Sequence, residues 1–158
     1  MEFNREILNK ITNLVRESCF EKGIGGPFGA AIFKDGELIG LGVNSVLSLK
    51  DPTAHAEVMA IRDACKKLNT FDLTGCEIYA TGFPCPMCMS AIIWANIKKV
   101  YYSADYKDAE SIGFRDSYIY NFIKNGQKDV NVLNLEQVDK TSIIDLYKKF
   151  KENQGKLY

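Results

Sequence analysis

The chain has 158 residues, of which 46% are apolar and 25% are charged, as is ordinary for a folded globular protein. Its 20 basic residues balance its 20 acidic residues, so the formal net charge at neutral pH is zero. A neutral chain is poorly suited to bind a nucleic-acid backbone, and we expect no nucleic-acid partner. The length fits a single domain, which we expect to extend over residues 1–158.

The amino-terminal residues lack the basic and then apolar layout of a signal peptide, and no apolar run is long enough to cross a membrane. The five cysteines are an odd number in a chain without such a signal, which favours reduced thiols and metal binding over disulfides. We therefore expect a cytoplasmic protein that has no membrane partner.

The periodicity of apolar residues predicts alternating helices and strands. The expected helices cover residues 2–22, 55–68, 85–95 and 138–151, and the expected strands cover residues 30–33, 38–43, 76–80, 100–103 and 130–135. The first two strands, joined through Asp35-Gly36, form a hairpin, and the alternation that follows implies parallel pairing through crossovers. The glycine-rich residues 23–29 end the first helix and permit close approach of the backbone. Residues 106–125 are aromatic and irregular, which suits a pocket wall, an interface or a core.

Two short motifs carry the chemistry of the sequence. Thr53-Ala54-His55-Ala56-Glu57 opens the second expected helix, and Pro84-Cys85-Pro86-Met87-Cys88 opens the third. Cys85 and Cys88 are three positions apart, so they share one helix face, and His55 can complete a trio of ligands. Three protein ligands leave the fourth position of a zinc ion open for water, which marks a catalytic site. We therefore predict one Zn²⁺ per chain, held by these three residues.

Glu57 lies two positions after His55, so the two side chains do not share a side face of the helix. They can converge over its amino-terminal end if Thr53 is the N-cap residue. Glu57 would then be a catalytic residue that takes a proton from water and delivers it to the ring and to the leaving ammonia. The combination of both motifs is the signature of zinc-dependent nucleobase deaminases.

Other interpretations of the motifs have weaker support. A lone His-Ala-Glu is usually a solvated helix start, and a lone Cys-x-x-Cys can be a redox pair or half of a structural zinc site. The redox pair is disfavoured because the Trp-Cys-Gly context of thioredoxin-like motifs is absent, and His55 is the only histidine available to a structural site. An interaction module stabilised by zinc, without turnover, has no use for Glu57.

Four sequence blocks go beyond a general deaminase signature. They are Gly23–Ala30, Asp51–Glu57, Pro84–Cys88 with the Ala-Ile and Trp-Ala pairs that follow, and Gly113–Tyr120. On these blocks the chain resembles the bacterial guanine deaminases of the cytidine deaminase-like superfamily. The resemblance implies an α/β fold, a three-layer α-β-α sandwich with a five-stranded mixed sheet. It also implies zinc on His55, Cys85 and Cys88, with Glu57 as the proton shuttle.

The same resemblance implies how a small nucleobase is bound. Asp116 would be a second catalytic residue and would address the amino end of guanine. The substrate-binding residues would be Phe28, Asn44, Ala56, Trp94 and Tyr158. The implied reaction is hydrolysis of guanine to xanthine and ammonia. The family forms homodimers, in some members with the C-terminal segment swapped between subunits.

Two departures from the family pattern leave the substrate open. Phe83 replaces a Glu that precedes the Pro-Cys pair, and Arg115 replaces an acid that precedes Asp116. Phe83 can alter the pocket floor, and Arg115 can pair with Asp116 and lower its basicity. Guanosine, a pterin or another aminated heterocycle is therefore an alternative to guanine. Deamination of adenosine in tRNA shares both motifs, but the neutral charge and the aromatic C-terminal third favour a free base.

Overall fold

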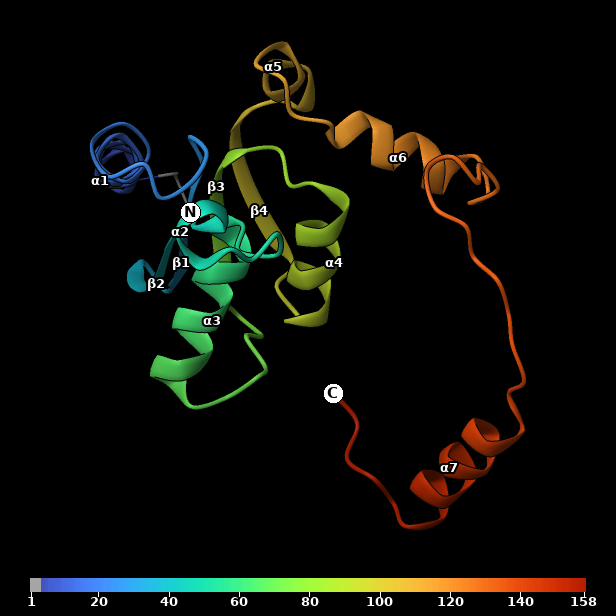
Figure 1. Cartoon of the computed structure of the whole chain (residues 1–158). Coiled ribbons are helices and arrows are strands. Elements are labelled where there is room, and N and C mark those ends of the chain that lie inside the picture. Colours follow the sequence, from blue (N-terminus) through green and yellow to red (C-terminus); the bar gives the residue numbers. More distant parts are fainter. Residues whose placement is uncertain (1–3) are drawn as a thin grey trace. The chain divides into compact units, whose positions relative to one another are not determined.

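The computed structural model of the chain describes residues 4–158 (Figure 1). The chain divides into two compact units. Unit 1 ends at Ser117, and unit 2 is Tyr118–Tyr158. Unit 1 holds the sheet and both sequence motifs, whereas unit 2 is made of helices and irregular segments.

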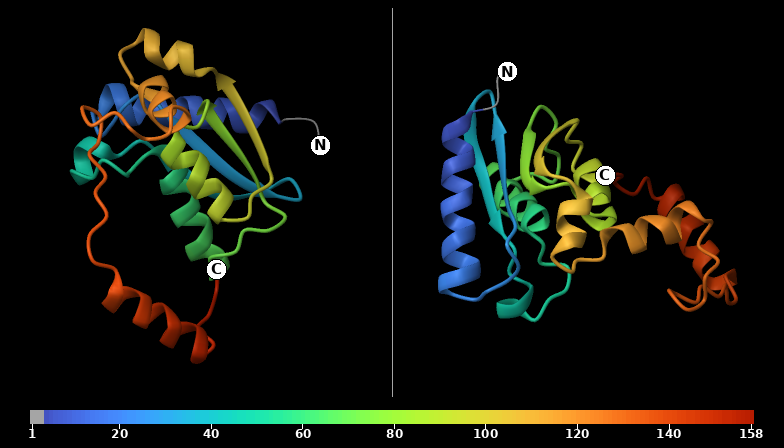
Figure 2. Two further views of the ribbon diagram at one scale, coloured as in Figure 1. Left: turned by 90° about the vertical axis from the view of Figure 1, so that its right-hand side faces the viewer. Right: turned by 90° about the horizontal axis from the view of Figure 1, so that it is seen from above.

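The described residues of unit 1 form a four-stranded mixed sheet with the strand order β2-β1-β3-β4 (Figures 1 and 2). The strands are β1 (Gly29–Lys34), β2 (Glu37–Val43), β3 (Glu77–Gly82) and β4 (Lys99–Ala104). β1 is antiparallel to both β2 and β3, and only β3 and β4 pair in parallel. The predicted hairpin is confirmed, and the prediction of parallel pairing holds for the last two strands alone.

The predicted fifth strand over residues 130–135 is wrong. These residues form a turn and an irregular segment in unit 2. Their alternating apolar pattern is compatible with a strand, but a strand forms only where a neighbouring strand satisfies its backbone N–H and C=O groups. Unit 2, all of which is described, contains no strand to pair with. The sheet of the described chain therefore has four strands, not the expected five.

Helices are found in all four ranges where the periodicity predicts them, and three further helices were not expected. The helices are α1 (Arg5–Val15), the π-helical η1 (Arg16–Glu21), α2 (Val46–Leu49), α3 (Ala56–Leu68), α4 (Pro86–Trp94), α5 (Tyr106–Ser111), α6 (Asp116–Lys124) and α7 (Thr141–Glu152). The expected start of the first helix at Glu2 lies outside the described residues. The segment 106–125, expected to be irregular, instead contains the whole of α5 and α6. None of the helices within residues 4–158 has both the length and the apolar character needed to cross a bilayer.

Helices cover both faces of the sheet, which makes three layers. Successive side chains of β1 point to opposite faces. Ala30 and Ile32 pack with α3 and α4 in one core cluster, whereas Ala31 and Phe33 pack with α1 in the other. Figure 2, viewed from above, shows α1 on one side of the strands and both α3 and α4 on the other. The cytidine deaminase-like α/β layering expected from the resemblance is thus confirmed.

Small residues bring β2 and α3 into close contact. A Cβ atom at Gly42 would overlap the carbonyl oxygen of Ala56, and one at Gly40 would lie 2.7 Å from the carbonyl oxygen of Ala60. Because only glycine leaves this space, the first turn of α3 is held directly against the end of β2. This contact places the His-Ala-Glu motif at one edge of the sheet.

Unit 2 exposes much of its apolar surface. In this fully described unit no side chain is buried. The side chains of Val138, Leu146 and Tyr147 are each more than half exposed. Asp139 accepts hydrogen bonds from the backbone N–H and the hydroxyl of Thr141 at the start of α7. A local turn therefore holds the start of α7, but the helix has no buried core of its own.

Candidate active site

Both motifs meet at the edge of the sheet where β2 and β3 end. Asn44 directly follows β2, and Cys85 follows β3 after a short loop. β1 is antiparallel to both strands, so Phe28, which precedes β1, lies at the same edge. The carboxyl ends of strands in an open α/β sheet are the usual position for a ligand.

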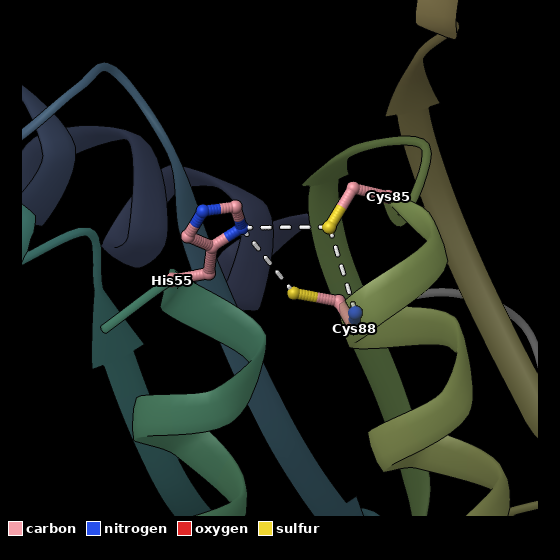
Figure 3. Close-up of side chains that lie close together, drawn as sticks. All are labelled: His55, Cys85 and Cys88. Atoms are coloured by element: carbon pink, nitrogen blue, oxygen red, sulfur yellow. Dashed lines mark hydrogen bonds between the residues drawn. The ribbon is translucent and has the colours of Figure 1, made fainter. Parts of the chain in front are cut away.

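The three predicted metal ligands converge between the amino-terminal ends of α3 and α4 (Figure 3). His55 and Cys85 are the N-cap residues of these helices, and Cys88 lies in the first turn of α4. The Nδ1 atom of His55 is 3.5 Å from the Sγ atom of Cys85 and 3.5 Å from that of Cys88. With tetrahedral zinc and ordinary bond lengths, a nitrogen and a sulfur ligand lie about 3.6 Å apart. The donor set and its spacing therefore fit a zinc ion.

The helix that carries His55 begins two residues later than the expected N-cap. Thr53 is not the N-cap residue, which corrects the sequence-based prediction. Asp51 accepts hydrogen bonds from the backbone N–H and the hydroxyl of Thr53, at 2.8 and 2.7 Å, so Thr53 belongs to the preceding turn. His55 itself takes the cap position with an extended backbone. Its ring consequently projects beyond the helix end and toward α4 (Figure 3).

The Cys85 side chain is held in the form that binds a metal. Hydrogen bonds from the Cys88 side chain and from His55 lower the pKa of the Cys85 thiol to about 4. The backbone N–H of Cys88 also points at this sulfur, at 3.5 Å, where the first turn of α4 has free N–H groups. The thiolate is the metal-binding form of cysteine.

A cavity opens beside the metal ligands, two of which, His55 and Cys85, line it. The predicted site residues that line it are Phe28, Asn44, His55, Ala56, Glu57, Cys85 and Asp116. Glu57 is only 8% exposed, and burial raises the pKa of its carboxyl. Asp116 is half-buried, and burial together with the nearby Cys85 raises its pKa. Two carboxyl groups therefore face the same small space as the metal ligands.

One side of the cavity is aromatic. The rings of Phe28 and Phe114 meet edge to face, with centroids 4.8 Å apart and an interplanar angle of 83°. Phe83, which also lines the cavity, packs edge to face against Tyr102 at 5.0 Å. These rings offer an apolar surface of the kind on which a planar heterocycle stacks.

Asn44 is fixed by the glycine-rich loop. Its Oδ1 atom accepts hydrogen bonds from the backbone N–H groups of Gly26 and Val46, each at 3.2 Å. A Cβ atom at Gly25 would overlap the carbonyl oxygen of Asn44. The expected close backbone approach at residues 23–29 is thus made to Asn44, which is buried at the rim of the cavity.

The family of the chain follows from residues 1–104, which match the model of the cytidine and deoxycytidylate deaminase zinc-binding region. The chain belongs to this deaminase family. The family match and the three converging ligands together confirm the prediction of a zinc-dependent deaminase. Among the described residues, one cluster of at least three His, Cys, Asp or Glu side chains can hold a metal, and it consists of His55, Cys85 and Cys88.

Known relatives of this deaminase act on two kinds of substrate. It is 55% identical over 101 residues to the guanine deaminase of Bacillus subtilis strain 168, a match that covers 64% of this chain and 65% of the relative. It is 49% identical over 100 residues to the tRNA-specific adenosine deaminase of Aquifex aeolicus strain VF5, covering 63% and 66%. Both matches span slightly less than two thirds of the length of the relatives.

A solved structure extends the similarity to nearly the whole deaminase chain. The X-ray structure of guanine deaminase from Bacillus subtilis superimposes with a TM-score of 0.89 at 41% sequence identity. The superposition covers 99% of this chain and 99% of that one. The similarity therefore includes the segment around Asp116, which lies beyond the family-model match.

The structure does not show a role in base binding for two predicted residues of the deaminase, Trp94 in unit 1 and Tyr158 in unit 2. Trp94 is the last residue of the nine-residue α4, whose length is roughly 13 Å, and its side chain is 65% exposed. It does not line the cavity that begins at the other end of this helix. Tyr158 is the last residue of unit 2 and is 81% exposed. Their roles in base binding stay predictions.

Sequence reasoning missed part of the lining. Gly82, Ala109 and Phe114 line the cavity but were not named as binding residues, although a pocket wall was one of the options for residues 106–125. Phe114 carried a usable signal, because it stands in the Gly113–Tyr120 block two positions before Asp116. Ala109 gave none, since a lone alanine in a short helix is ordinary. Phe83, expected either at the pocket floor or in the core, is a lining residue.

Proposed function

We propose that the protein catalyses the zinc-dependent hydrolytic deamination of guanine to xanthine and ammonia. The observation that carries this proposal is the position of Asp116, whose side chain lines the same cavity as the metal ligands and Glu57. A carboxylate accepts the hydrogen bonds that the amino end of guanine donates. The full-length similarity to a solved guanine deaminase, which extends through this residue, supports the choice of base.

The residues of the chain divide the work of the reaction. Zinc bound to the three ligands supplies a Lewis acid that makes a water molecule more acidic. Glu57 accepts a proton from the water that attacks the amino-bearing carbon and delivers it to the ring nitrogen. It then accepts the second proton from the new hydroxyl group on that carbon and delivers it to the departing amino group. The bond from carbon to oxygen forms, and the bond from carbon to the amino nitrogen breaks as ammonia leaves. Asp116 holds the amino end of the base in place during these transfers.

The remaining lining residues would bind and orient the base. Phe28 and Phe114 offer aromatic surfaces, and stacking on such a surface contributes about 1 to 3 kcal/mol per base. Ala56 is buried beside the ligands, and its small side chain leaves room for a ring close to the metal. The buried amide of Asn44 offers polar contacts at the rim.

A second function is supported by one comparison. The chain is 49% identical over 100 residues to a tRNA-specific adenosine deaminase, and adenosine in tRNA is the substrate that the name of this relative gives. The zero net charge of this chain disfavours a polynucleotide substrate. Among small substrates, guanosine, a pterin or another aminated heterocycle is an alternative to guanine because of Phe83 and Arg115.

We further propose that residues 1–158 act as one catalytic domain that is completed in a homodimer. Unit 2 exposes large apolar side chains on α7 and on residues 130–138, and a second copy of the chain would cover them. A C-terminal segment exchanged between two copies would bring Tyr158 to the cavity of the partner. All five cysteines, each in the described part of the chain, are free thiols, which favours the cytoplasm as the location. Light scattering of the purified protein should give twice the chain mass of 17.8 kDa, and a monomer would contradict the dimer.

Ammonia release from a panel of substrates tests the proposed function. The panel contains guanine, guanosine, adenine, cytosine and tRNA, each offered to the zinc-loaded protein. Guanine should be deaminated at least about a hundredfold more efficiently than adenine or cytosine. Neither of these bases has a ring N–H beside its amino group, so the Asp116 carboxylate would lose a hydrogen-bond donor. Inosine formed in tRNA would instead establish the second function, and release from guanosine or another small compound would replace guanine as the substrate.

A further inference from the structure

A hydrogen bond joins α5 to α6, the helix that begins with Asp116. The hydroxyl of Ser117 donates to the Oε1 atom of Glu110 at 2.6 Å. This distance lies at the short end of the range for hydrogen bonds between oxygen atoms. Glu110 belongs to α5, and Ser117 is the second residue of α6. Both residues belong to unit 1, and neither lines the cavity.

The backbone of Glu110, the hydrogen-bond acceptor on α5, is held in place by the contacts of this helix. Asp105 and Asp108 form a complete capping box at the start of this helix. Ala109 is buried and lines the cavity, so the helix is also anchored on its inner side. Glu110 follows Ala109 directly, and its side chain therefore extends from a fixed point toward the start of α6.

The turn between α5 and α6 is held by backbone hydrogen bonds to Ala109 and Glu110. The backbone N–H of Gly113 donates to the carbonyl oxygen of Glu110 at 2.9 Å, and that of Phe114 donates to Ala109 at 3.1 Å. Gly113 has a φ of 99°, which a residue with a side chain rarely adopts. The hydroxyl of Ser117, three residues after Phe114, adds a side-chain contact, or tether, to the same helix α5.

The geometry of a helix makes this tether relevant to Asp116. Adjacent residues of an α-helix project about 100° apart around its axis. When the side chain of Ser117 is bound to Glu110, the rotation of the first turn of α6 is fixed. The direction of Asp116, one position earlier, is then fixed as well.

We propose that Glu110 and Ser117 are positioning residues that aim the Asp116 carboxylate into the cavity. This inference rests on the proposed function, in which Asp116 binds the amino end of guanine. Without the tether, the first turn of α6 can rotate, and the carboxylate samples positions in which it cannot reach the base. A displacement of about 1 Å in such a group is enough to reduce catalytic efficiency substantially.

Structures of the zinc-loaded protein and its variants test the inference directly. In Ser117→Ala, the Asp116 carboxylate should shift or split into two positions, whereas Ser117→Thr, which keeps the hydroxyl, should leave it in place. Ser111→Ala is a matched control, because it removes a hydroxyl hydrogen bond of the same 2.6 Å length from α5 without touching α6. An unmoved Asp116 in Ser117→Ala would overturn the proposal. This readout does not depend on which substrate is used.

Kinetics with guanine test the functional consequence. Ser117→Ala and Glu110→Ala should each raise KM about tenfold and change kcat by less than about threefold, because the contact of Asp116 with the base is made in both the bound and the transition state. In an Asp116→Asn background, Ser117→Ala should have almost no further effect, since it acts through the missing carboxylate. A full additional loss in that background would show a general structural role and contradict the proposal. If guanine is not deaminated at all, the proposed function fails, and the position of Asp116 in the variant structures still decides whether the tether aims it.

Discussion

The two sides of the cavity are held in different ways. On one side, which we call the metal wall, His55 and Cys85 cap helices that pack against the buried face of the sheet. On the other, the base wall, Phe114 and Asp116 lie at the junction of two short helices with exposed surfaces. The metal wall is therefore supported by a dense core, whereas the base wall lies nearer the surface and is held in part by hydrogen bonds and by the contact of Phe28 with Phe114.

This difference indicates which property each wall controls. The close contact of Gly42 with Ala56 leaves the first turn of α3 no space to move, as a metal site with fixed ligand distances requires. The edge-to-face contact of Phe28 with Phe114 can adjust when either ring is replaced. We expect substitutions in the metal wall to abolish the reaction, and substitutions in the base wall to change the affinity for the base or the choice of it.

The largest effect is expected from the loss of a metal ligand. His55→Ala and Cys85→Ala should each lose zinc and all measurable turnover, because three protein ligands are the minimum for this type of site. Zinc content per chain, measured by elemental analysis, checks the result. Cys19→Ala is the matched control, since this cysteine is a free thiol outside the cavity and should keep about one zinc per chain. Zinc retained in both variants would contradict the assignment of His55 and Cys85 as metal ligands.

Glu57→Ala should separate metal binding from catalysis. The variant should keep zinc and lose about two to four powers of ten in kcat, the usual contribution of general acid-base catalysis. Steady-state production of xanthine and zinc content measured on the same sample check this expectation. If the variant turns over guanine at a rate close to that of the parent protein, the proton is transferred by another group.

Asp116→Asn tests the base wall without touching the metal. We expect a loss of about 10- to 100-fold in kcat/KM for guanine, because a hydrogen bond to a charged acceptor is lost while zinc is retained. Asp35→Asn is a control at the tip of the β1-β2 hairpin, where asparagine tolerates the positive φ of 50°. The control should be indistinguishable from the parent. If Asp116→Asn has the same kinetics as the parent protein, Asp116 does not bind the base.

Phe114→Ala should weaken base binding less than Asp116→Asn does. Loss of an aromatic surface that contributes about 1 to 3 kcal/mol per base corresponds to a rise in KM of about 5- to 150-fold, with the lower part expected because Phe28 remains. Phe20→Ala provides a control, since this ring is 77% exposed and does not line the cavity. An unchanged KM in Phe114→Ala would assign the ring to packing alone.

The smallest effect is expected from the tail. Deletion of Leu157 and Tyr158, both 81% exposed, should lower kcat/KM for guanine severalfold if the tail excludes water from the bound base. The melting temperature should not change, because neither side chain is buried. Identical kinetics before and after the deletion would show that the tail takes no part in the site.

The metal wall was predictable from the sequence because its chemistry is local. The spacing of Cys85 and Cys88 and the position of His55 at a helix start define the ligand set before any long-range contact is known. The N-cap was the exception: Asp51 binds the side chain and the backbone of Thr53, and this competition between two local hydrogen-bond patterns is not visible in the periodicity.

The base wall and the number of strands in the sheet were less predictable because they depend on contacts between residues far apart in the sequence. Phe28 and Phe114 are far apart in the sequence, and their ring contact follows only from the folded chain. Trp94 belongs to the same motif block as Cys85, yet the length of α4 separates it from the cavity. The alternation over residues 130–135 predicts a strand, but it does not supply the neighbouring strand that pairing requires.

The most direct test of zinc-dependent guanine deamination is the stoichiometric conversion of guanine by the protein with and without its metal. The zinc-loaded protein should form xanthine and ammonia in equal amounts, the protein stripped by a chelator should form neither, and added zinc should restore both. Failure of the zinc-loaded protein to form xanthine, or undiminished formation after the metal is removed, would contradict this account.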